Sequence, residues 1–443
     1  MTRHTKRQKT INLLQEFSVP LIAGVFAALY FANSDATQYH HLTHSPLHHL
    51  VGHSPTAGSH APGGGWFDFL TLHFLVNDLF MALFFGIAAK EITEACLPGG
   101  ALNPVSKAIN PLFATVGGVL GPIGVFLLLN SLMGSAAWSS GWGIPTATDI
   151  ALAWLAARLV FGNGHPAISF LLLLAVADDG IGLAIIAIAY PNPDHPTLWA
   201  NALWILPGMA AAYGLRRAGV RSWIPYIAGG GAFSWYGLYS AHLHPALALV
   251  FIVPFLPGPR RDLGLFLEAA DDNAAPPSSA GQWARHLHSP LEQFEHQLKL
   301  PVDLGLFFFA FVNAGVALSG FSDLTWIILV SLIVGKTLGI TTCSLLGQRL
   351  GFDLPAGMRL KHLVVVGVIA GLGLTVALFV SGQAFTDAAL QGAAKMGALL
   401  SACALFIAIA LGWVLNVRDV PRSRGITWPA WKWSEKGLVR AAE

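Results

Sequence analysis

The sequence predicts an all-α polytopic membrane protein with about twelve transmembrane helices. Three observations support this: 54% of the 443 residues are hydrophobic, only 11% are charged, and long apolar runs recur from end to end. Soluble proteins average roughly 25% charged residues, and a helix needs about 20 apolar residues to cross a bilayer. The composition therefore excludes an ordinary soluble enzyme, and a net charge of +2 gives no reason to expect a nucleic-acid partner.

Apolar runs between turn signals define the candidate spans. In chain order the spans are Leu13–Asn33, Phe67–Ala89, Pro111–Met133, Ile144–Val160, Pro166–Tyr190, Leu198–Leu215, Trp223–Ser240, His244–Leu256, Val302–Leu318, Leu324–Gln348, His362–Gln383 and Met396–Leu415. The first follows a basic stretch, but it is long for a signal peptide and no small-residue cleavage site follows it. We therefore expect it to be the first helix.

The distribution of Lys and Arg favours one orientation of these spans. With residues 1–12 in the cytoplasm, all of the 25 basic residues except Lys336 and Lys395 fall in the N-terminus, an inner loop or the tail. Cytoplasmic loops of membrane proteins carry such an excess. The predicted organisation is eight spans over residues 13–256, a cytoplasmic connector over 257–301, four spans over 302–416 and a cytoplasmic tail over 417–443.

The predicted outer loop 34–65 is rich in histidine and has no Lys or Arg. Its histidines are His40, His41, His44, His48, His49, His53 and His60. Such a tract can bind metal, but no cluster of Cys, Asp or Glu completes a site, so we expect a solvated loop. The three cysteines, Cys96, Cys343 and Cys403, are scattered and lack metal-ligand spacing, which predicts neither a disulfide framework nor a zinc site.

Five charged residues fall within predicted spans away from the span ends: Asp78, Asp149, Asp178, Asp179 and Lys336. Each costs about 2.5–3.5 kcal/mol at mid-bilayer, and such residues usually have a function. Asp178 and Asp179 are the strongest signal, because adjacent desolvated carboxylates repel one another and at least one readily takes up a proton. Ionised, the pair offers hard oxygen ligands to a small cation, and protonated it releases that cation. The alternative role, a helix cap or tether, explains a single acid better than a pair.

The other intramembrane charges are less specific. Lys336 lies about a dozen residues into its span, too deep for easy snorkelling, so it needs a carboxylate or exposed carbonyls nearby. For Asp78 we leave two roles open: a hydrogen bond between helices, or a place on the ion pathway.

Two spans are interrupted at corresponding positions. Residues 143–149, Gly-Ile-Pro-Thr-Ala-Thr-Asp, and residues 370–375, Ala-Gly-Leu-Gly-Leu-Thr, disfavour a continuous helix. Each is the middle span of a triplet, spans three to five and ten to twelve, and the triplets start on opposite sides of the membrane. Paired interruptions of this kind indicate inverted-topology repeats and a transporter binding site. Asp149 and Lys336 have charges suited to the N-terminal and C-terminal ends of half-helices.

Five motifs occur in order in the spans just described: Asn77-Asp78 with Met81-Ala82-Leu83-Phe84-Phe85, residues 145–151 (Pro-Thr-Ala-Thr-Asp-Ile-Ala), Ala177-Asp178-Asp179, Asn313-Ala314-Gly315-Val316 and Gly335-Lys336-Thr337-Leu338-Gly339. With them the chain resembles bacterial sodium/proton antiporters of the NhaA type over nearly the whole membrane portion. Antiporters of this type are themselves a known example of inverted repeats.

The resemblance implies a role for each residue of the site. Asp179 would be the principal carboxylate for cation and proton, Asp178 would pair with Lys336 in the ion-free or protonated state, and Thr148, Asp149 and Thr375 would lie where the broken helices cross. Thr148 would join Asp178 and Asp179 as a ligand of transported Na+. The implied activity is electrogenic exchange of Na+ or Li+ for H+ in the bacterial inner membrane by alternating access, with no cofactor.

Some departures from the family pattern limit what the resemblance implies. Ala88 and Ile92 stand where we place carboxylates of the family's cytoplasmic funnel, so the pH activation profile is left open, and a less steep pH response is expected. The His-rich loop replaces a β-hairpin dimer contact, so homodimerisation is left open too. A proton antiporter for another cation such as K+ is the main alternative. An intramembrane aspartyl protease is disfavoured, because no Gly-x-Gly-Asp element precedes Asp149 or Asp178.

Overall fold

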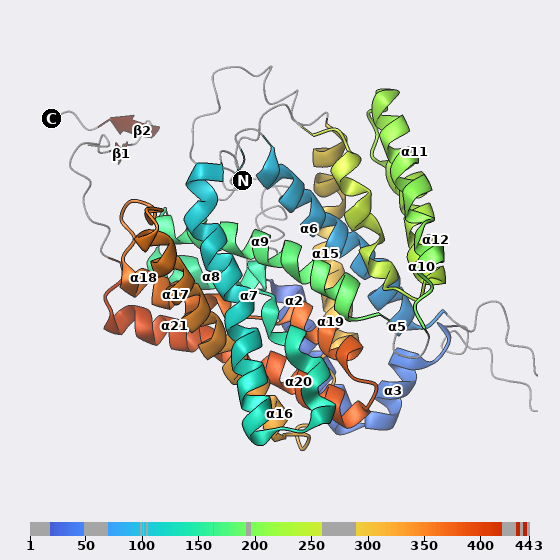
Figure 1. Cartoon of the computed structure of the whole chain (residues 1–443), viewed down its shortest axis with the longest axis horizontal. Coiled ribbons are helices and arrows are strands. Elements are labelled where there is room, and N and C mark those ends of the chain that lie inside the picture. The colour runs from blue at the N-terminus through green and yellow to red at the C-terminus, as the bar shows by residue number, and fades with distance from the viewer. Residues whose placement is uncertain are drawn as a thin grey trace, which may run out of the picture.

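The computed structural model describes residues 18–47, 70–97, 100, 102, 105–162, 164–191, 196–258, 289–418, 431–434 and 437–440 (Figure 1). The chain is a helical polytopic membrane protein, as the composition predicts. Among the residues just given, the strands form one short antiparallel pair in the tail: β1 (Trp431–Ser434) and β2 (Gly437–Arg440).

The helices fall into three consecutive groups along the chain. The first group is α2 (Val19–Ser34), α3 (Ala36–His44), α5 (Leu72–Phe74), the π-helical turn Leu75–Phe80, α6 (Met81–Cys96), α7 (Val105–Met133), the 3-10 helix Ala136–Thr146, α8 (Ile150–Phe161) and α9 (Pro166–Ala189). The second is α10 (Trp199–Ala202), α11 (Ile205–Arg217), the π-helical turn Tyr226–Gly231, α12 (Ala232–Ser240) and the 3-10 segments Pro245–Phe251 and Val253–Phe255. The third is α15 (Pro290–Asn313), α16 (Asp323–Val330), the π-helical turn Ser331–Gly335, α17 (Lys336–Arg349), α18 (Leu360–Ala370), α19 (Thr375–Ala384), α20 (Ala388–Leu400) and α21 (Cys403–Val414).

Five helical stretches of the described chain are long and apolar enough to cross a membrane: Leu72–Cys96, Ala108–Met133, Pro166–Ala189, Asp323–Arg349 and Ala388–Val414. Two helix pairs pass the same test only when each pair is taken together. Their members are bent by 58° (Ala136–Thr146 with α8) and by 51° (α18 with α19).

Local capping explains where two helices differ from the predicted boundaries. Helix α3 occupies the start of the predicted outer loop 34–65, because the Asp35 side chain accepts a hydrogen bond from the Gln38 backbone N–H (2.9 Å) as an N-cap. The loop positions His48, His49, His53 and His60 lie outside the described residues. Helix α15 starts at Pro290, inside the predicted connector 257–301, because Ser289 caps it and proline suits the first helical position.

The two bent pairs meet at their breaks. In the first, residues Ala147 and Asp149 have extended backbone after Pro145, and α8 starts at Ile150. In the second, residues 371–374 separate α18 from α19. The Asp149 backbone N–H donates to the Leu372 carbonyl (2.6 Å), so the breaks are joined directly through the backbone.

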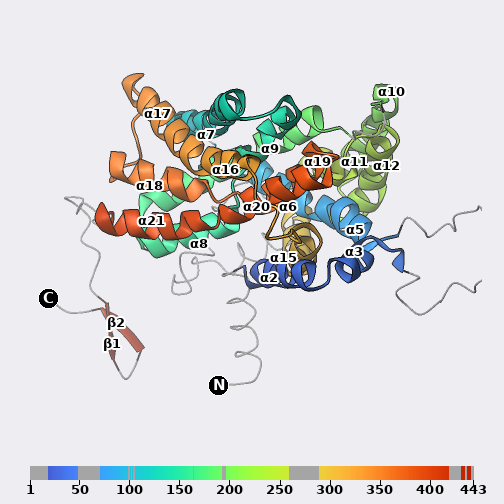
Figure 2. The same cartoon turned by 90° about the horizontal axis from the view of Figure 1, so that it is seen from below.

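Close packing of α7 against α17 places the residues of the site. The two helices lie side by side in both views (Figures 1 and 2), and a side chain added at Gly117 or Gly339 would collide with the backbone of the facing helix. Small residues allow such an approach between membrane helices. Lys336 starts α17 on this interface and points toward α9, which also packs on α7.

Candidate functional site

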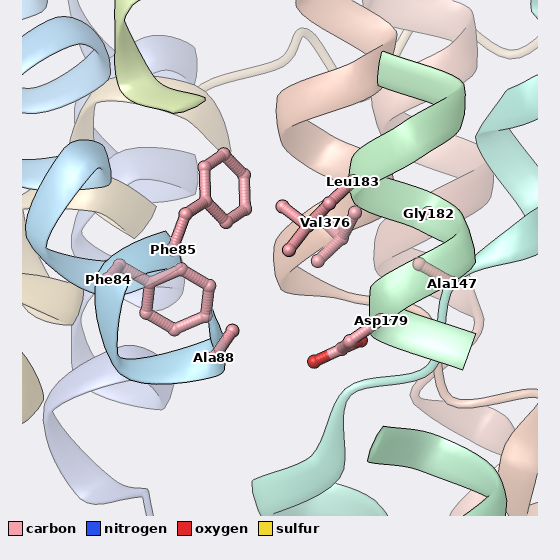
Figure 3. Close-up of a pocket in the computed structure, with 8 residues that line it drawn as sticks. All are labelled: Phe84, Phe85, Ala88, Ala147, Asp179, Gly182, Leu183 and Val376. Carbon is pink, nitrogen blue, oxygen red and sulfur yellow. The ribbon is translucent and has the colours of Figure 1, made fainter. Parts of the chain in front are cut away.

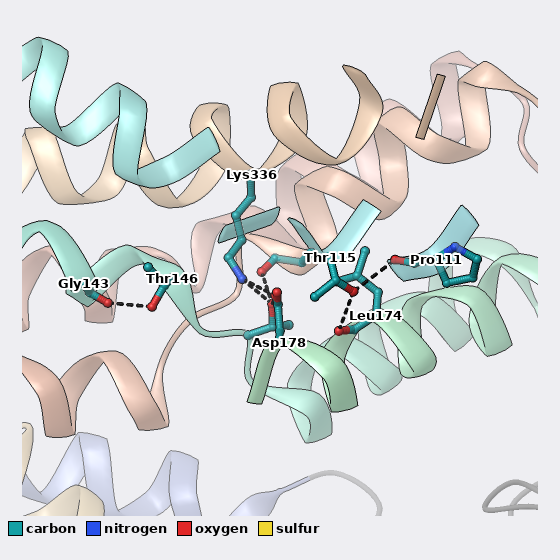
Figure 4. Close-up of polar contacts among 9 residues, drawn as sticks. Pro111, Thr115, Gly143, Thr146, Leu174, Asp178 and Lys336 are labelled. Atoms are coloured by element: carbon teal, nitrogen blue, oxygen red, sulfur yellow. Dashed lines mark hydrogen bonds and ion pairs between the residues drawn. The ribbon is translucent and has the colours of Figure 1, made fainter. Parts of the chain in front are cut away.

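A fully buried ion pair joins α17 to α9. Lys336 Nζ lies 2.7 Å from Asp178 Oδ2, and the exposed fraction of both side chains is 0% (Figure 4). The π-helical turn Ser331–Gly335 directly precedes Lys336, and such turns are frequent at functional sites. The structure therefore provides the carboxylate that a lysine at this depth requires.

Thr148 connects this ion pair to the helix break. Lys336 Nζ donates to Thr148 Oγ1 (2.6 Å), which lies 3.0 Å from both Asp178 Oδ2 and the Ala370 carbonyl. A hydroxyl has one proton, so at any time Thr148 donates either to the carboxylate or to the last carbonyl of α18. The ammonium group of Lys336 is thus held by oxygens of the kind that bind a hard cation.

Asp179 faces a different part of the bundle. Its carboxylate points into a small cavity with room for about one water molecule, lined among others by Phe84, Ala88, Ala147 and Val376 (Figure 3). Asp179 Oδ1 is buried and has no hydrogen-bond partner among the described residues. The two neighbouring acids are therefore unequal: within the described part of the chain, Asp178 is paired with an ammonium group and Asp179 is not.

Asp149 caps two helices at once, α8 and α19. Its Oδ1 accepts a hydrogen bond from the Leu152 backbone N–H at the start of α8 (3.1 Å), and its Oδ2 accepts from the Thr375 N–H at the start of α19 (3.3 Å). An anion is favoured where the N-terminal ends of helices converge. Asp149, Thr148 and Thr375 are each buried, with exposed fractions of 4%, 1% and 4%.

Five of the residues predicted for the site are thus brought together: Asp149 with Thr375, and Thr148 with Asp178 and Lys336. Asp179 follows Asp178 on α9 and opens to its own cavity.

Asp78 lies apart from this centre. It sits in the π-helical turn Leu75–Phe80 and lines a larger, polar cavity of about 450 Å³. No group of three or more His, Cys, Asp or Glu residues that could hold a metal ion occurs within the described part of the chain. The histidine tract therefore forms no such group where the structure describes it.

A second charged cluster was not predicted. The sequence places Lys90 in an inner loop, but it lies inside α6 with an exposed fraction of 4% and contacts Glu94 (2.7 Å) and Glu295 of α15. Glu91 is the next residue of α6. Carboxylates therefore occupy this end of the bundle although positions 88 and 92 carry none. The available signal was the i, i+4 spacing of Lys90 and Glu94.

Tyr190 was also missed, because a tyrosine at the end of an apolar helix gives no signal by itself. Its hydroxyl accepts from the Gly143 N–H (2.8 Å) and donates to the Ser140 carbonyl (2.7 Å). Thr146 continues this support by donating to the Gly143 carbonyl (2.7 Å; Figure 4). Together these bonds fix the 3-10 helix that leads into the break at Asp149.

Apolar spans, two helix breaks joined by a buried carboxylate, and a second acid open to a cavity are typical of a membrane transport protein. A family model described as Na+/H+ antiporter 1 matches residues 9–415, and the chain belongs to this family. It is 55% identical over 418 residues to the Na+/H+ antiporter NhaA of Geobacter metallireducens, covering 94% of this chain and 100% of that relative.

Other relatives agree. The Na+/H+ antiporter NhaA of Desulfitobacterium hafniense strain Y51 is 54% identical over 415 residues, covering 94% of this chain and 98% of the relative. The Na+/H+ antiporter NhaA of Jannaschia sp. is 42% identical over 432 residues, covering 92% and 98%. The predicted resemblance is thereby confirmed.

Proposed function

We propose that the protein is a secondary transporter that exchanges Na+ or Li+ for H+ across the bacterial inner membrane. The supporting observation is the inequality of the two neighbouring acids: Asp178 is bound to Lys336, whereas Asp179 has no ammonium partner among the described residues and opens to a cavity. An unpaired buried carboxylate needs a positive partner, because an isolated charge in a low-dielectric interior is costly. A proton or a small cation meets that need, and binding of one excludes the other.

Lys336 gives Asp178 a different part in the exchange. The ammonium group contacts Asp178 Oδ2 and Thr148 Oγ1. A cation that binds to both acids therefore competes with Lys336 for these oxygens. We propose that Thr148 is a ligand of the cation in that state. When the cation takes the place of Lys336 on Asp178, the displaced ammonium group releases one proton and Asp179 releases another, so two protons exchange for one monovalent cation. Protons then move inward in excess of Na+, and the exchange is electrogenic and driven by the proton-motive force.

The arrangement of the helices supports a proposal of alternating access. We propose twelve spans in which the two bent pairs are discontinuous helices of inverted repeats, with both termini cytoplasmic. The Asp149 carboxylate would keep the two breaks together while the bundle around them rocks against the remaining helices. Asp78 would lie on the path between the centre and the outer side.

The decisive experiment is exchange in proteoliposomes under an imposed pH gradient, with Na+, Li+ and K+ compared side by side. Asp179→Asn should abolish cation-induced proton movement, because an amide neither carries the proton nor supplies the negative charge. Asp387→Asn is the matched control, since Asp387 is an exposed N-cap of α20 and asparagine also caps helices. Retained exchange in Asp179→Asn would refute the assignment, and exchange of K+ alone would favour the alternative cation.

A further inference from the structure

The cavity that Asp78 lines, of about 450 Å³, is unusually rich in imidazole and amide groups. We call it the histidine cavity. Besides Asp78 its walls carry the side chains of His44, His73, Asn77, His244, Asn313, Gln383, Gln391 and Lys395. The His44 and His73 rings stack with centroids 5.0 Å apart, and His40 stacks on His44 at 4.4 Å.

A chain of hydrogen bonds along one wall fixes the direction of every donor. Asn313 Nδ2 lies 3.1 Å from the Phe309 carbonyl, which can only accept, so the amide orientation of Asn313 is determined. Its second N–H then donates to Asn77 Oδ1 (2.8 Å). Asn77 Nδ2 is left to donate to Asn313 Oδ1 (3.4 Å) and to His73 Nε2 (2.9 Å).

The last hydrogen bond of this series, from Asn77 to His73, determines the protonation state of His73. Because Asn77 donates to Nε2, that nitrogen has a free lone pair, and His73 is neutral with its proton on Nδ1. Charging His73 would place an N–H on Nε2 against the amide donor of Asn77. Flipping the Asn77 amide relieves that clash, but the N–H group of Asn77 then faces the N–H donor of Asn313. Flipping the Asn313 amide as well places the Asn313 side-chain oxygen against the Phe309 carbonyl, which is also an acceptor.

We propose that His73 is a proton-operated latch of the histidine cavity: neutral, it holds the Asn77–Asn313 amide pair closed, and its protonation opens that pair. The pair joins the π-helical turn beside Asp78 to the end of α15. A buried donor or acceptor that is left without a partner is costly, so the protonated imidazole and the closed amide pair exclude one another.

The charged neighbours of His73 come from every element around it. His44 stacks on it from α3, and His244 faces the cavity from the position just before the 3-10 segment Pro245–Phe251. Lys395 comes from α20, and Asp78 lies on the same helical stretch as His73. Partial burial and the neighbouring imidazole of His40 lower the pKa of His44, so the neutral ring is favoured there as well. A proton on His73 therefore adds a positive charge beside Lys395, with Asp78 as the one acid among the described residues of the cavity wall.

The consequence for transport rests on the proposed function, in which this cavity leads to the outer side. A cation entering from outside would meet a more positive cavity once His73 is protonated. We therefore expect the apparent KM for outer Na+ to rise as outer pH falls, partly through His73 and independently of proton competition at Asp179.

Histidine NMR tests the latch without any transport. In 15N-histidine-labelled protein, the signal of His73 is assigned as the one of 17 that is lost in His73→Gln. We expect the Nδ1–H tautomer, and we expect the side-chain amide signals of Asn77 and Asn313 to change at the same pH at which His73 titrates. An Nε2–H tautomer, or titration of His73 with unchanged amide signals, would overturn the proposal.

Sided transport tests the consequence. In proteoliposomes of one orientation, His73→Gln keeps an amide that can bond Asn77 but cannot be charged. The ratio of the outer KM at pH 4 to that at pH 8 should therefore fall, by up to roughly threefold where His73 is fully charged in the parent. The same variant should behave like the parent for inner Na+, and His41→Gln, an exposed histidine on α3, should change neither side. An unchanged outer ratio would contradict the latch. A protein that exchanges no Na+ at all would remove the proposed function but leave the NMR result standing.

Discussion

Replacing Lys336 by alanine removes the only ammonium group that contacts Asp178 among the described residues. Its Nζ donates to Asp178 Oδ2 at 2.7 Å and to Thr148 Oγ1 at 2.6 Å, and neither charged side chain is exposed. Lys336→Ala leaves a buried carboxylate with the Thr148 hydroxyl as its remaining partner in the described part of the chain, together with a void where the lysine side chain lay. We expect a large loss of stability.

Two independent estimates give its size. Breaking a buried ion pair by removing one partner costs about 3–5 kcal/mol. Asp178 can avoid an unpaired charge by taking up a proton, but neutralising a carboxyl of ordinary pKa near 3.9 at pH 7 costs about 3 pH units at 1.36 kcal/mol each, or roughly 4 kcal/mol. The expected loss in the free energy of unfolding is therefore about 4 kcal/mol, and it should shrink as the pH is lowered toward 4.

A double-mutant cycle separates the charge effect from the void. Lys336→Met keeps much of the side-chain volume, and combining it with Asp178→Asn removes both charges, so the double variant should be more stable than Lys336→Met alone. The measurement is equilibrium unfolding in mixed micelles with SDS as denaturant, at pH 7 and pH 5. A Lys336→Ala variant within about 0.5 kcal/mol of the parent, or a double variant less stable than both single ones, would refute the pairing.

Two further predictions concern the polar groups around the pair. Thr148→Val should raise the KM for Na+ and remove the hydrogen bond to the Ala370 carbonyl. Thr148→Ser keeps the hydroxyl and should exchange Na+ like the parent. Equal KM values in the two variants would show that Thr148 is not a ligand of the cation. Tyr190→Phe leaves the Gly143 N–H and the Ser140 carbonyl without their partner, so unfolding should cost about 1–3 kcal/mol less, with KM unchanged. Parental stability would show that water replaces the hydroxyl.

The sequence predicts the helical class well, and it shows which charged residues interrupt apolar runs, because both features depend on local composition. Charges inside apolar runs stand out, and Gly and Pro mark the interrupted segments at 143–149 and 370–375 without any knowledge of packing. The capping of α3 by Asp35 and of α15 by Ser289 also follows local rules, and closer attention to N-cap residues would have placed both helix starts.

The remaining features depend on contacts between distant segments. The bond from Asn313 to Asn77 spans 236 positions, and the close approach of Gly117 to Gly339 joins helices far apart in the chain. The sequence places Lys90 in a loop because charge marks helix ends in a membrane protein, yet two carboxylates compensate it inside α6 and at α15. The spacing of residues in the sequence does not predict an ion-pair partner that comes from another helix.

Helix geometry changes the meaning of the adjacent acids. Consecutive side chains of an α-helix point about 100° apart. The side chains of Asp178 and Asp179 therefore face different parts of the bundle, although the two residues are neighbours in sequence. Asp178 faces Lys336 and the helix break, whereas Asp179 faces the cavity walled by Phe84 and Ala88 of α6. Lysine therefore neutralises one acid, while the other has no ammonium partner among the described residues, and under the proposed function competition between proton and cation would begin at Asp179. It follows that substitutions of α6 residues on the cavity wall should change the relative KM values for Na+, Li+ and K+ more than substitutions around Lys336 do.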